Sequence, residues 1–191
     1  MIAKDLATVS FASAADWLAW LDAEHDRSPG VWLVIAKKGA PTPSVTYAEA
    51  LDGALRYGWI DGQKAARDQH VWLQRFTPRA PRSRWSRLNR DKAVALIGEG
   101  LMRPAGLRQV ELAQADGRWD AAYAGQATAE VPDDLRAALD ADPGAAAFFA
   151  TLTGANRYAI LYRVQDAKRP ETRAKRIEQY VALCREHRTL H

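Results

Sequence analysis

An arginine-rich stretch in the middle of the chain holds the residue types best suited to chemistry with an anion. A guanidinium group binds phosphate or carboxylate through paired N–H donors, and a helix that begins nearby adds free backbone N–H groups. The stretch therefore predicts an oxyanion-binding pocket. Its candidate ligand-binding residues are Arg75, Arg79, Arg82, Ser83, Arg84, Trp85, Ser86 and Asn89.

Two alternatives stand beside this pocket. Trp85 has only polar neighbours in the sequence, so it could stack on a base, as aromatic side chains between cations do in proteins that bind single-stranded nucleic acid. The arginines could instead pair with carboxylates between residues 109 and 142 and hold their own loop in place. We favour a small anion or an acidic protein surface as the partner over nucleic acid.

A second candidate lies around Asp61, in the run Trp59-Ile60-Asp61-Gly62. An aspartate beside cations such as Lys38 could orient a ligand or act as a base, which would make the protein an enzyme acting on a phosphorylated or carboxylated small molecule. The simpler interpretation is that Asp61-Gly62 forms a tight turn. Lys38, Trp59 and Asp61 join the candidate ligand-binding residues, and Asp61 is the candidate catalytic residue.

The sequence offers little evidence for a metal or cofactor site. His187 and His191 have a spacing that two metal ligands could share, but they lack a third ligand, and the single cysteine, Cys184, lies on an apolar helix face. The chain has no Gly-x-Ser-x-Gly elbow, Walker phosphate loop, Rossmann glycine fingerprint or His-Glu-x-x-His motif. We therefore expect no cofactor and no metal, and favour a noncatalytic role.

Charge is segregated along the 191 residues although the net charge is only +4. The net charge is −3 for residues 1–63, +8 for 64–108, −5 for 109–162 and +4 for 163–191. Two basic segments flank an acidic one, which favours an anionic partner or internal neutralisation. The last segment carries a basic stripe that we interpret as a docking surface for a partner: Arg169, Arg173 and Arg176.

The hydrophobic pattern predicts an α+β fold: a small mixed sheet with packed helices, followed by an all-helical C-terminal unit. We expect strands near residues 8–11, 31–36, 59–66 and 71–76, and helices with capping signals at Ser13 and Thr46. The domain boundaries that follow are an α+β unit at 1–123, a small-residue linker at 124–131 and a helical unit at 132–191, which could also pack as one domain with the first.

With 48% apolar residues and one cysteine, the chain has the composition of a globular protein without disulfides. No apolar stretch approaches the length needed to cross a bilayer, and the start lacks the pattern of a signal peptide. We expect a cytoplasmic protein.

Several blocks in a fixed order resemble the YdeI/OmpD-associated family of bacterial proteins, and the resemblance runs from about Trp32 to Cys184. The blocks are residues 54–62 (ALRYGWIDG), 75–79 (RFTPR), 83–89 (SRWSRLN), 115–120 (ADGRWD) and 167–177 (AKRPETRAKRI). The resemblance implies a role in bacteriocin protection or tolerance of antimicrobial peptides, and it alone implies an envelope protein as partner. It supplies no catalytic residue.

Overall fold

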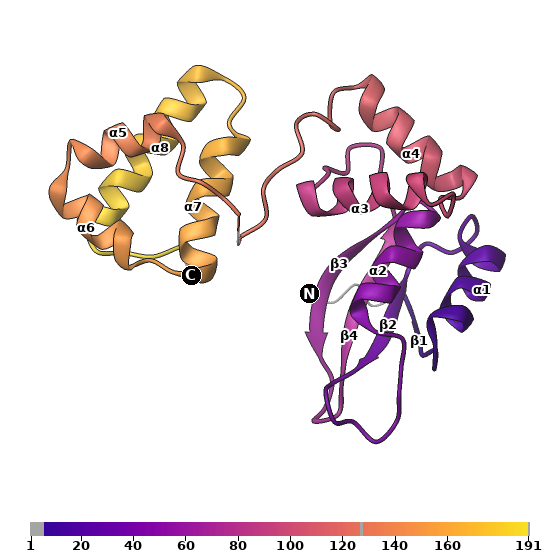
Figure 1. Cartoon of the computed structure of the whole chain (residues 1–191). Helices are drawn as coiled ribbons and strands as arrows, with labels where there is room; N and C mark the ends of the chain where they lie inside the picture. Colours follow the sequence, from indigo (N-terminus) through magenta and orange to yellow (C-terminus); the bar gives the residue numbers. More distant parts are fainter. Residues whose placement is uncertain (1–5, 127, 191) are drawn as a thin grey trace. The chain divides into compact units, whose positions relative to one another are not determined.

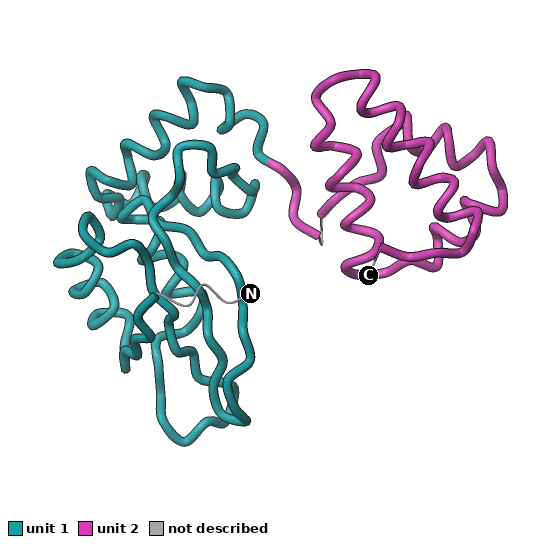
Figure 2. The backbone as a smooth tube through the Cα atoms, turned by 180° about the vertical axis from the view of Figure 1, so that it is seen from behind, with its two compact units in different colours: residues 1–122 teal, residues 123–191 magenta. Residues whose placement is uncertain are grey.

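The computed structural model describes residues 6–126 and 128–190. These residues fall into two compact units, coloured separately in Figure 2: unit 1 is Met1–Ala122 and unit 2 is Tyr123–His191. The sheet and all of its strands belong to unit 1, and unit 2 is helical, so the α+β fold class is confirmed. Two residues that entered the sequence analysis, Ala127 of the linker and His191, lie outside the described residues.

Unit 1 contains a four-stranded mixed sheet in the order β1-β2-β4-β3. β1 and β2 are parallel and joined by α1, whereas β4 is antiparallel to both of its neighbours. α2 packs on α1 and β3, and α3 and α4 pack on α2 at one end of the sheet (Figure 1). The elements are β1 (Ala7–Val9), α1 (Ala14–Glu24), β2 (Val31–Ala36), α2 (Tyr47–Arg56), β3 (Trp59–Ala66), β4 (Val71–Pro78), α3 (Arg87–Gly98) and α4 (Pro104–Ala115).

Local sequence signals explain where several helices begin. Ser13 and Thr46 form capping boxes with Asp16 and Glu49. The hydroxyl of the first residue accepts from the backbone N–H of the second, and the carboxylate of the second accepts from the backbone N–H of the first. Ser86 caps α3 by accepting from the backbone N–H of Asn89. The caps at Ser13 and Thr46 match the sequence prediction.

The core of unit 1 lies between one face of the sheet and the helices. Val31, Leu33 and Phe76 from the sheet meet Trp17 and Leu51 from the helices, and all five are at most 2% exposed. The indole N–H of a buried tryptophan usually requires an acceptor, and here Trp17 donates to Ala50 O and Trp59 to His25 O, both at 3.0 Å. Most tryptophans therefore build the core.

Trp85 corrects the expectation that its polar neighbours make it an exposed stacking residue. Its side chain is 2% exposed, because Arg79 covers its ring and Trp119 meets it edge to face at a centroid distance of 5.0 Å. Arg79 belongs to the same arginine-rich stretch, but Trp119 is distant in the sequence, so the residues around Trp85 gave no signal of this burial. A base or aromatic ligand has no access to the ring in this structure.

The turn interpretation of Asp61-Gly62 is also wrong, because both residues lie inside β3. Asp61 pairs with Phe76 of β4, and the register then shifts before Lys64 pairs with Gln74. The side-chain amide of Gln74 donates to the Gly62 carbonyl at 2.9 Å. This bond gives the carbonyl a partner at the point where the strand pairing is irregular. The strand predicted at 59–66 is therefore correct and carries a bulge.

Two glycines allow α4 to pack closely on the end of α2. Gly58 ends α2 in the left-handed conformation, at φ +73°, and a Cβ there would lie 2.8 Å from the carbonyl oxygen of Ala105. A Cβ on Gly106 would lie 2.4 Å from the carbonyl oxygen of Arg56. This close approach sets the distance between α4 and the loop that follows α2.

Unit 2 packs four helices around an apolar core of its own: α5 (Asp133–Asp140), α6 (Pro143–Thr151), α7 (Gly154–Asp166) and α8 (Pro170–Arg185). Leu135, Phe149, Ile160 and Cys184 are among its buried residues. Burial raises the pKa of the Cys184 thiol, which therefore behaves as a core residue. Among the described residues of the whole chain, no helix combines the length and the apolar character needed to span a membrane.

Candidate functional site

Two motifs that are separate in the sequence meet at one pocket of unit 1, of about 230 Å³. Trp59 at the start of β3 pairs with Pro78 at the end of β4, which brings Arg79 beside the loop after α2. The backbone N–H of Arg79 donates to the Gly58 carbonyl at 3.0 Å and fixes this junction. We call this pocket, lined by Trp59, Arg79 and Arg108 among others, the Arg79–Arg108 pocket.

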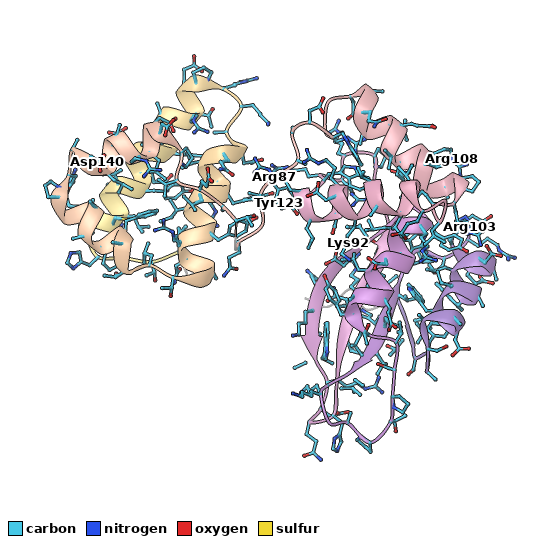
Figure 3. All side chains as sticks on the ribbon, viewed as in Figure 1. Arg87, Lys92, Arg103, Arg108, Tyr123 and Asp140 are labelled. Carbon is cyan, nitrogen blue, oxygen red and sulfur yellow. The ribbon has the colours of Figure 1, made fainter. Side chains whose placement is uncertain are left out.

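Its two arginines differ in how firmly they are held. The Arg79 side chain is 5% exposed, its guanidinium carbon lies 3.6 Å from the centroid of the Trp85 ring, and its Nη1 donates to the Arg84 carbonyl at 3.2 Å. Arg108 projects from α4, where it is labelled in Figure 3, and is exposed. Within the described part of the chain Arg108 forms no ion pair. The pocket thus combines a fixed cation with one free to meet a ligand.

The remaining wall comes from the end of α1 and from Tyr57. Tyr57 donates to Asp22 at 2.8 Å, and burial, followed by this hydrogen bond, raises the pKa of its phenol. Asp26 is the acidic residue of the wall, and the Arg27 guanidinium lies 3.7 Å from its carboxylate. The Arg27 charge therefore offsets part of the repulsion that Asp26 would exert on an incoming anion.

A second pocket, of about 400 Å³, lies beside the loop between β2 and α2. Lys38, Tyr47 and Trp72 line it, and the Lys64 ammonium sits 4.3 Å from the centroid of the Trp72 ring. Asp61 reaches this region, since Tyr47 donates to its carboxylate at 2.8 Å. Partial burial of Tyr47, whose side chain is 37% exposed, and this hydrogen bond raise the pKa of its phenol above the usual range.

The other predicted residues do not gather at one place. Arg82 is exposed on a turn, the Ser83 carbonyl accepts from Arg118 at 2.8 Å, and Asn89 is 7% exposed on the inner side of α3. Arg75 lies in the middle of β4, opposite Trp32 of β2, and Arg84 is half-buried. The structure thus joins Trp59 to Arg79, and it places Lys38 and Asp61 around the other pocket.

Two ion pairs of the basic segment are seen in the described part of the chain. Arg90 pairs with the adjacent Asp91 at 3.3 Å, and Lys92 pairs with Asp52 of α2 at 2.7 Å. Neither carboxylate belongs to residues 109–142, the range from which the sequence analysis drew partners for the arginines.

Two family models match different parts of the chain. Residues 9–109, from β1 into α4, match the model described as a domain of unknown function, DUF8412. The chain belongs to this family. Residues 128–187 match the model described as bacteriocin-protection, YdeI or OmpD-associated, OmdA. No curated protein and no solved structure matches the chain.

The OmdA match confirms the resemblance found in the sequence and limits its extent. The block at 167–177 lies inside the OmdA match, whereas the blocks at 54–62, 75–79 and 83–89 lie inside the DUF8412 match. The block at 115–120 lies between the two matches. The Arg79–Arg108 pocket is therefore a feature of the DUF8412 domain.

In the OmdA domain, the predicted docking stripe is partly engaged within its own unit. Arg173 of α8 forms two hydrogen bonds to the Asp134 carboxylate, at 2.5 and 2.8 Å, and a third to the Val164 carbonyl. Arg176 donates to the Arg163 carbonyl, and Arg169 is exposed just before α8. Arg173 thus ties α8 to α5 and α7, and the docking role of the stripe stays a prediction.

Sequence reasoning missed Arg108, Tyr57 and the end of α1 as parts of the site. Arg108 occupies an ordinary helix position, and only the close packing of α4 through Gly106 brings it to the pocket. Tyr57 stands directly before the Gly-Trp-Ile-Asp-Gly run, so the motif could have indicated it.

Proposed function

We propose that the protein is a noncatalytic binding protein whose DUF8412 domain takes a small phosphate- or carboxylate-bearing molecule in the Arg79–Arg108 pocket. The observation that carries this proposal is that Arg79 and Arg108, two arginines from distant parts of the chain, line one pocket of about 230 Å³. A guanidinium pair supplies donors on two sides of a bound oxyanion.

The fixed position of Arg79 supports binding because an already ordered side chain loses little conformational entropy when a ligand arrives. Its burial against Trp85 also places its charge away from bulk water, where attraction to an anion is stronger. Arg108 completes the site from the solvent side. Of the candidate arginines in the arginine-rich stretch, the proposal keeps Arg79, and it adds Arg108 from α4.

The noncatalytic reading is supported by the position of the candidate base. Asp61 is not among the residues lining the Arg79–Arg108 pocket, and its carboxylate accepts a hydrogen bond from Tyr47 beside the other pocket. A general base must lie within hydrogen-bond reach of the proton that it removes. Asp61 therefore does not serve a ligand held by Arg79 and Arg108.

The test is a titration of the full chain with inorganic phosphate, with citrate and with a short single-stranded oligonucleotide, each at several salt concentrations, followed by tryptophan fluorescence. We expect saturable binding of phosphate or citrate that survives moderate salt, because a formed pocket is less screened than an open surface. Arg108→Gln should weaken this binding roughly tenfold, the loss of one charge-assisted contact. Arg87→Gln, an exposed arginine at the start of α3, is the matched control and should leave it unchanged.

Oligonucleotide binding that is lost as salt rises, without binding of the small anions, would contradict the pocket and would indicate a basic surface that binds nucleic acid. Equal effects of Arg108→Gln and Arg87→Gln on binding would also contradict the proposal, because an arginine outside the pocket would then contribute as much to anion binding as one inside it.

We propose that the protein contributes to tolerance of bacteriocins or other antimicrobial peptides, in line with the description of the OmdA model. Loss of the gene in its native bacterium should lower survival under such a peptide, and the wild-type gene should restore it. If the Arg79–Arg108 pocket is part of this role, the Arg108→Gln gene should restore survival less well than the Arg87→Gln gene. Unchanged survival after deletion would contradict this biological role, but it would not contradict anion binding by the Arg79–Arg108 pocket.

A further inference from the structure

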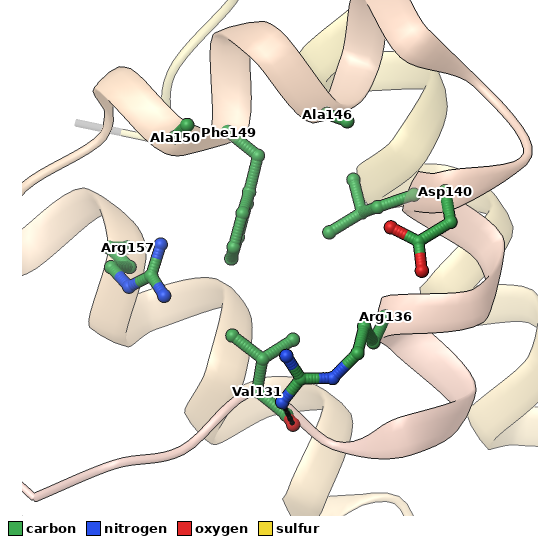
Figure 4. Close-up of a pocket in the computed structure, with 8 residues that line it drawn as sticks. Val131, Arg136, Asp140, Ala146, Phe149, Ala150 and Arg157 are labelled. Carbon is green, nitrogen blue, oxygen red and sulfur yellow. Dashed lines mark hydrogen bonds between the residues drawn. The ribbon is translucent and has the colours of Figure 1, made fainter.

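The OmdA domain contains a pocket of its own, of about 240 Å³, between α5, α6 and α7. Its floor is apolar: Leu139 and Phe149 are each 5% exposed, and Val131, Ala146 and Ala150 complete the lining. Figure 4 shows these side chains around an open centre. Apolar floors of this kind take the hydrocarbon part of a ligand.

Two arginines stand at the rim of this pocket (Figure 4). The guanidinium carbon of Arg157, from α7, lies 4.6 Å from the centroid of the Phe149 ring. Arg136, from α5, donates through Nη2 to the Val131 carbonyl at 3.2 Å. Its other N–H groups remain to donate to a ligand. Within residues 6–126 and 128–190, neither arginine forms an ion pair.

Asp140 is the third charged residue of the rim. It follows Arg136 by one helical turn, a spacing that favours an ion pair, yet the two do not pair within the described structure. Figure 4 shows Asp140 and Arg157 on opposite sides of the pocket, with Phe149 between them. The rim therefore holds two cations and one anion whose charges are not neutralised by direct pairing.

We infer that this pocket binds a monocarboxylate that carries a small apolar or aromatic group. The hydrocarbon part would lie on Phe149 and Leu139, and the carboxylate would meet the free donors of Arg157 and Arg136. A phosphate dianion fits less well, because the floor offers no polar partner and Asp140 repels a second negative charge. This site is separate from the Arg79–Arg108 pocket and does not depend on the function proposed for it.

The ligand could be a simple aryl acid or an aromatic amino acid, since both present a carboxylate next to an apolar group. The ammonium group of an amino acid would be attracted to Asp140, whereas the aryl acid has no such group. Comparison of 3-phenylpropanoate with phenylalanine distinguishes these two sources. The neutral 3-phenylpropanol has the same apolar group and serves as the uncharged control.

The experiment adds each probe to the full, isotope-labelled chain and follows backbone amide shifts by NMR. We expect saturable shifts at Phe149, Leu139 and Ala146 with 3-phenylpropanoate, phenylalanine or both, and binding of the neutral alcohol at least tenfold weaker. Arg157→Gln should weaken carboxylate binding roughly tenfold, and Arg157→Lys, which keeps the charge, should retain much of it. Arg188→Gln, exposed after α8, should change nothing.

Three results would overturn the inference: no saturable shift with either carboxylate, equal binding of the neutral alcohol, or full binding by Arg157→Gln. Each variant is first compared with the wild-type spectrum, so that a loss of binding is read only from a folded domain. If Arg157→Gln fails to fold, Arg136→Gln takes its place, because Arg136 is exposed and, among the described residues, donates to the Val131 carbonyl alone.

Discussion

The guanidinium carbon of Arg79 lies 3.6 Å from the centroid of the Trp85 ring, and both side chains are at most 5% exposed. This pair joins the end of β4 to the loop before α3, and the hydrogen bond from Arg79 to the Arg84 carbonyl closes the same loop. Arg79 therefore has a structural task besides its place in the Arg79–Arg108 pocket.

Arg79→Ala should destabilise the chain by about 2–3 kcal/mol. The substitution uncovers the Trp85 ring, leaves a cavity and removes the hydrogen bond to Arg84. Arg82→Ala, an exposed arginine three residues later, should change the free energy of unfolding by less than about 0.5 kcal/mol. Urea denaturation measures both. Equal losses for the two variants would contradict the structural role of Arg79.

Gly106→Ala should destabilise unit 1 by more than about 2 kcal/mol. It should also weaken anion binding by the Arg79–Arg108 pocket. The new Cβ would meet the backbone of α2 at 2.4 Å, so α4 must move away and carry Arg108 with it. Gly98→Ala is the matched control, because nothing lies within 4 Å of a Cβ there. It should be neutral or slightly stabilising in thermal denaturation. A tolerated Gly106→Ala would show that α4 does not pack this closely.

The Tyr47 phenol should ionise at a higher pH than an ordinary tyrosine. Burial, and then the hydrogen bond to Asp61, raise its pKa, so the folded state holds this proton more tightly than the unfolded chain. The resulting stabilisation is fully present below the ordinary tyrosine pKa and declines as the pH rises through the folded pKa. Ultraviolet titration of tyrosinate checks this, with Tyr47→Phe to identify the signal.

Asp61→Asn should lower the pKa of Tyr47 only part of the way, because burial remains when the carboxylate is removed. A tyrosine titration that Tyr47→Phe does not alter at high pH would contradict the assignment.

The OmdA domain should lose stability in acid when its Asp134–Arg173 pair is lost. The hydrogen bonds from Arg173 hold the pKa of Asp134 below its usual range, so their contribution is present above the unfolded pKa and disappears as the pH falls through the folded one. Arg173→Gln should cost about 0.5–1 kcal/mol near neutral pH, as expected for a partly exposed pair. The difference from wild type should vanish at strongly acidic pH. Arg188→Gln is the control, and a pH-independent difference would contradict the account.

Local signals in the sequence predicted much of the fold. The capping boxes at Ser13 and Thr46 and the apolar run at 31–36 correspond to real elements, because each signal and its partner lie within a few residues. The first strand is shorter than expected, Ala7–Val9 rather than 8–11. Asp61-Gly62 misled because only pairing with β4 reveals that this dipeptide continues a strand.

The candidate site was harder to predict than the fold. Trp59 and Arg79 could be singled out as unusual residues, but strand pairing determines that they share a pocket. Arg108 and the burial of Trp85 depend on contacts between residues far apart in the sequence, for which a single sequence has no local pattern.

The measurement that tests the central claim most directly is an NMR titration of the full, isotope-labelled chain with inorganic phosphate, read at backbone amides and arginine side chains. The account predicts saturable shifts at Gly58, Trp59, Arg79 and Arg108, with binding roughly tenfold weaker in Arg108→Gln and unchanged in Arg87→Gln. Shifts confined to exposed arginines such as Arg82 and Arg87, or no saturable shift, would contradict a phosphate-binding pocket between Arg79 and Arg108.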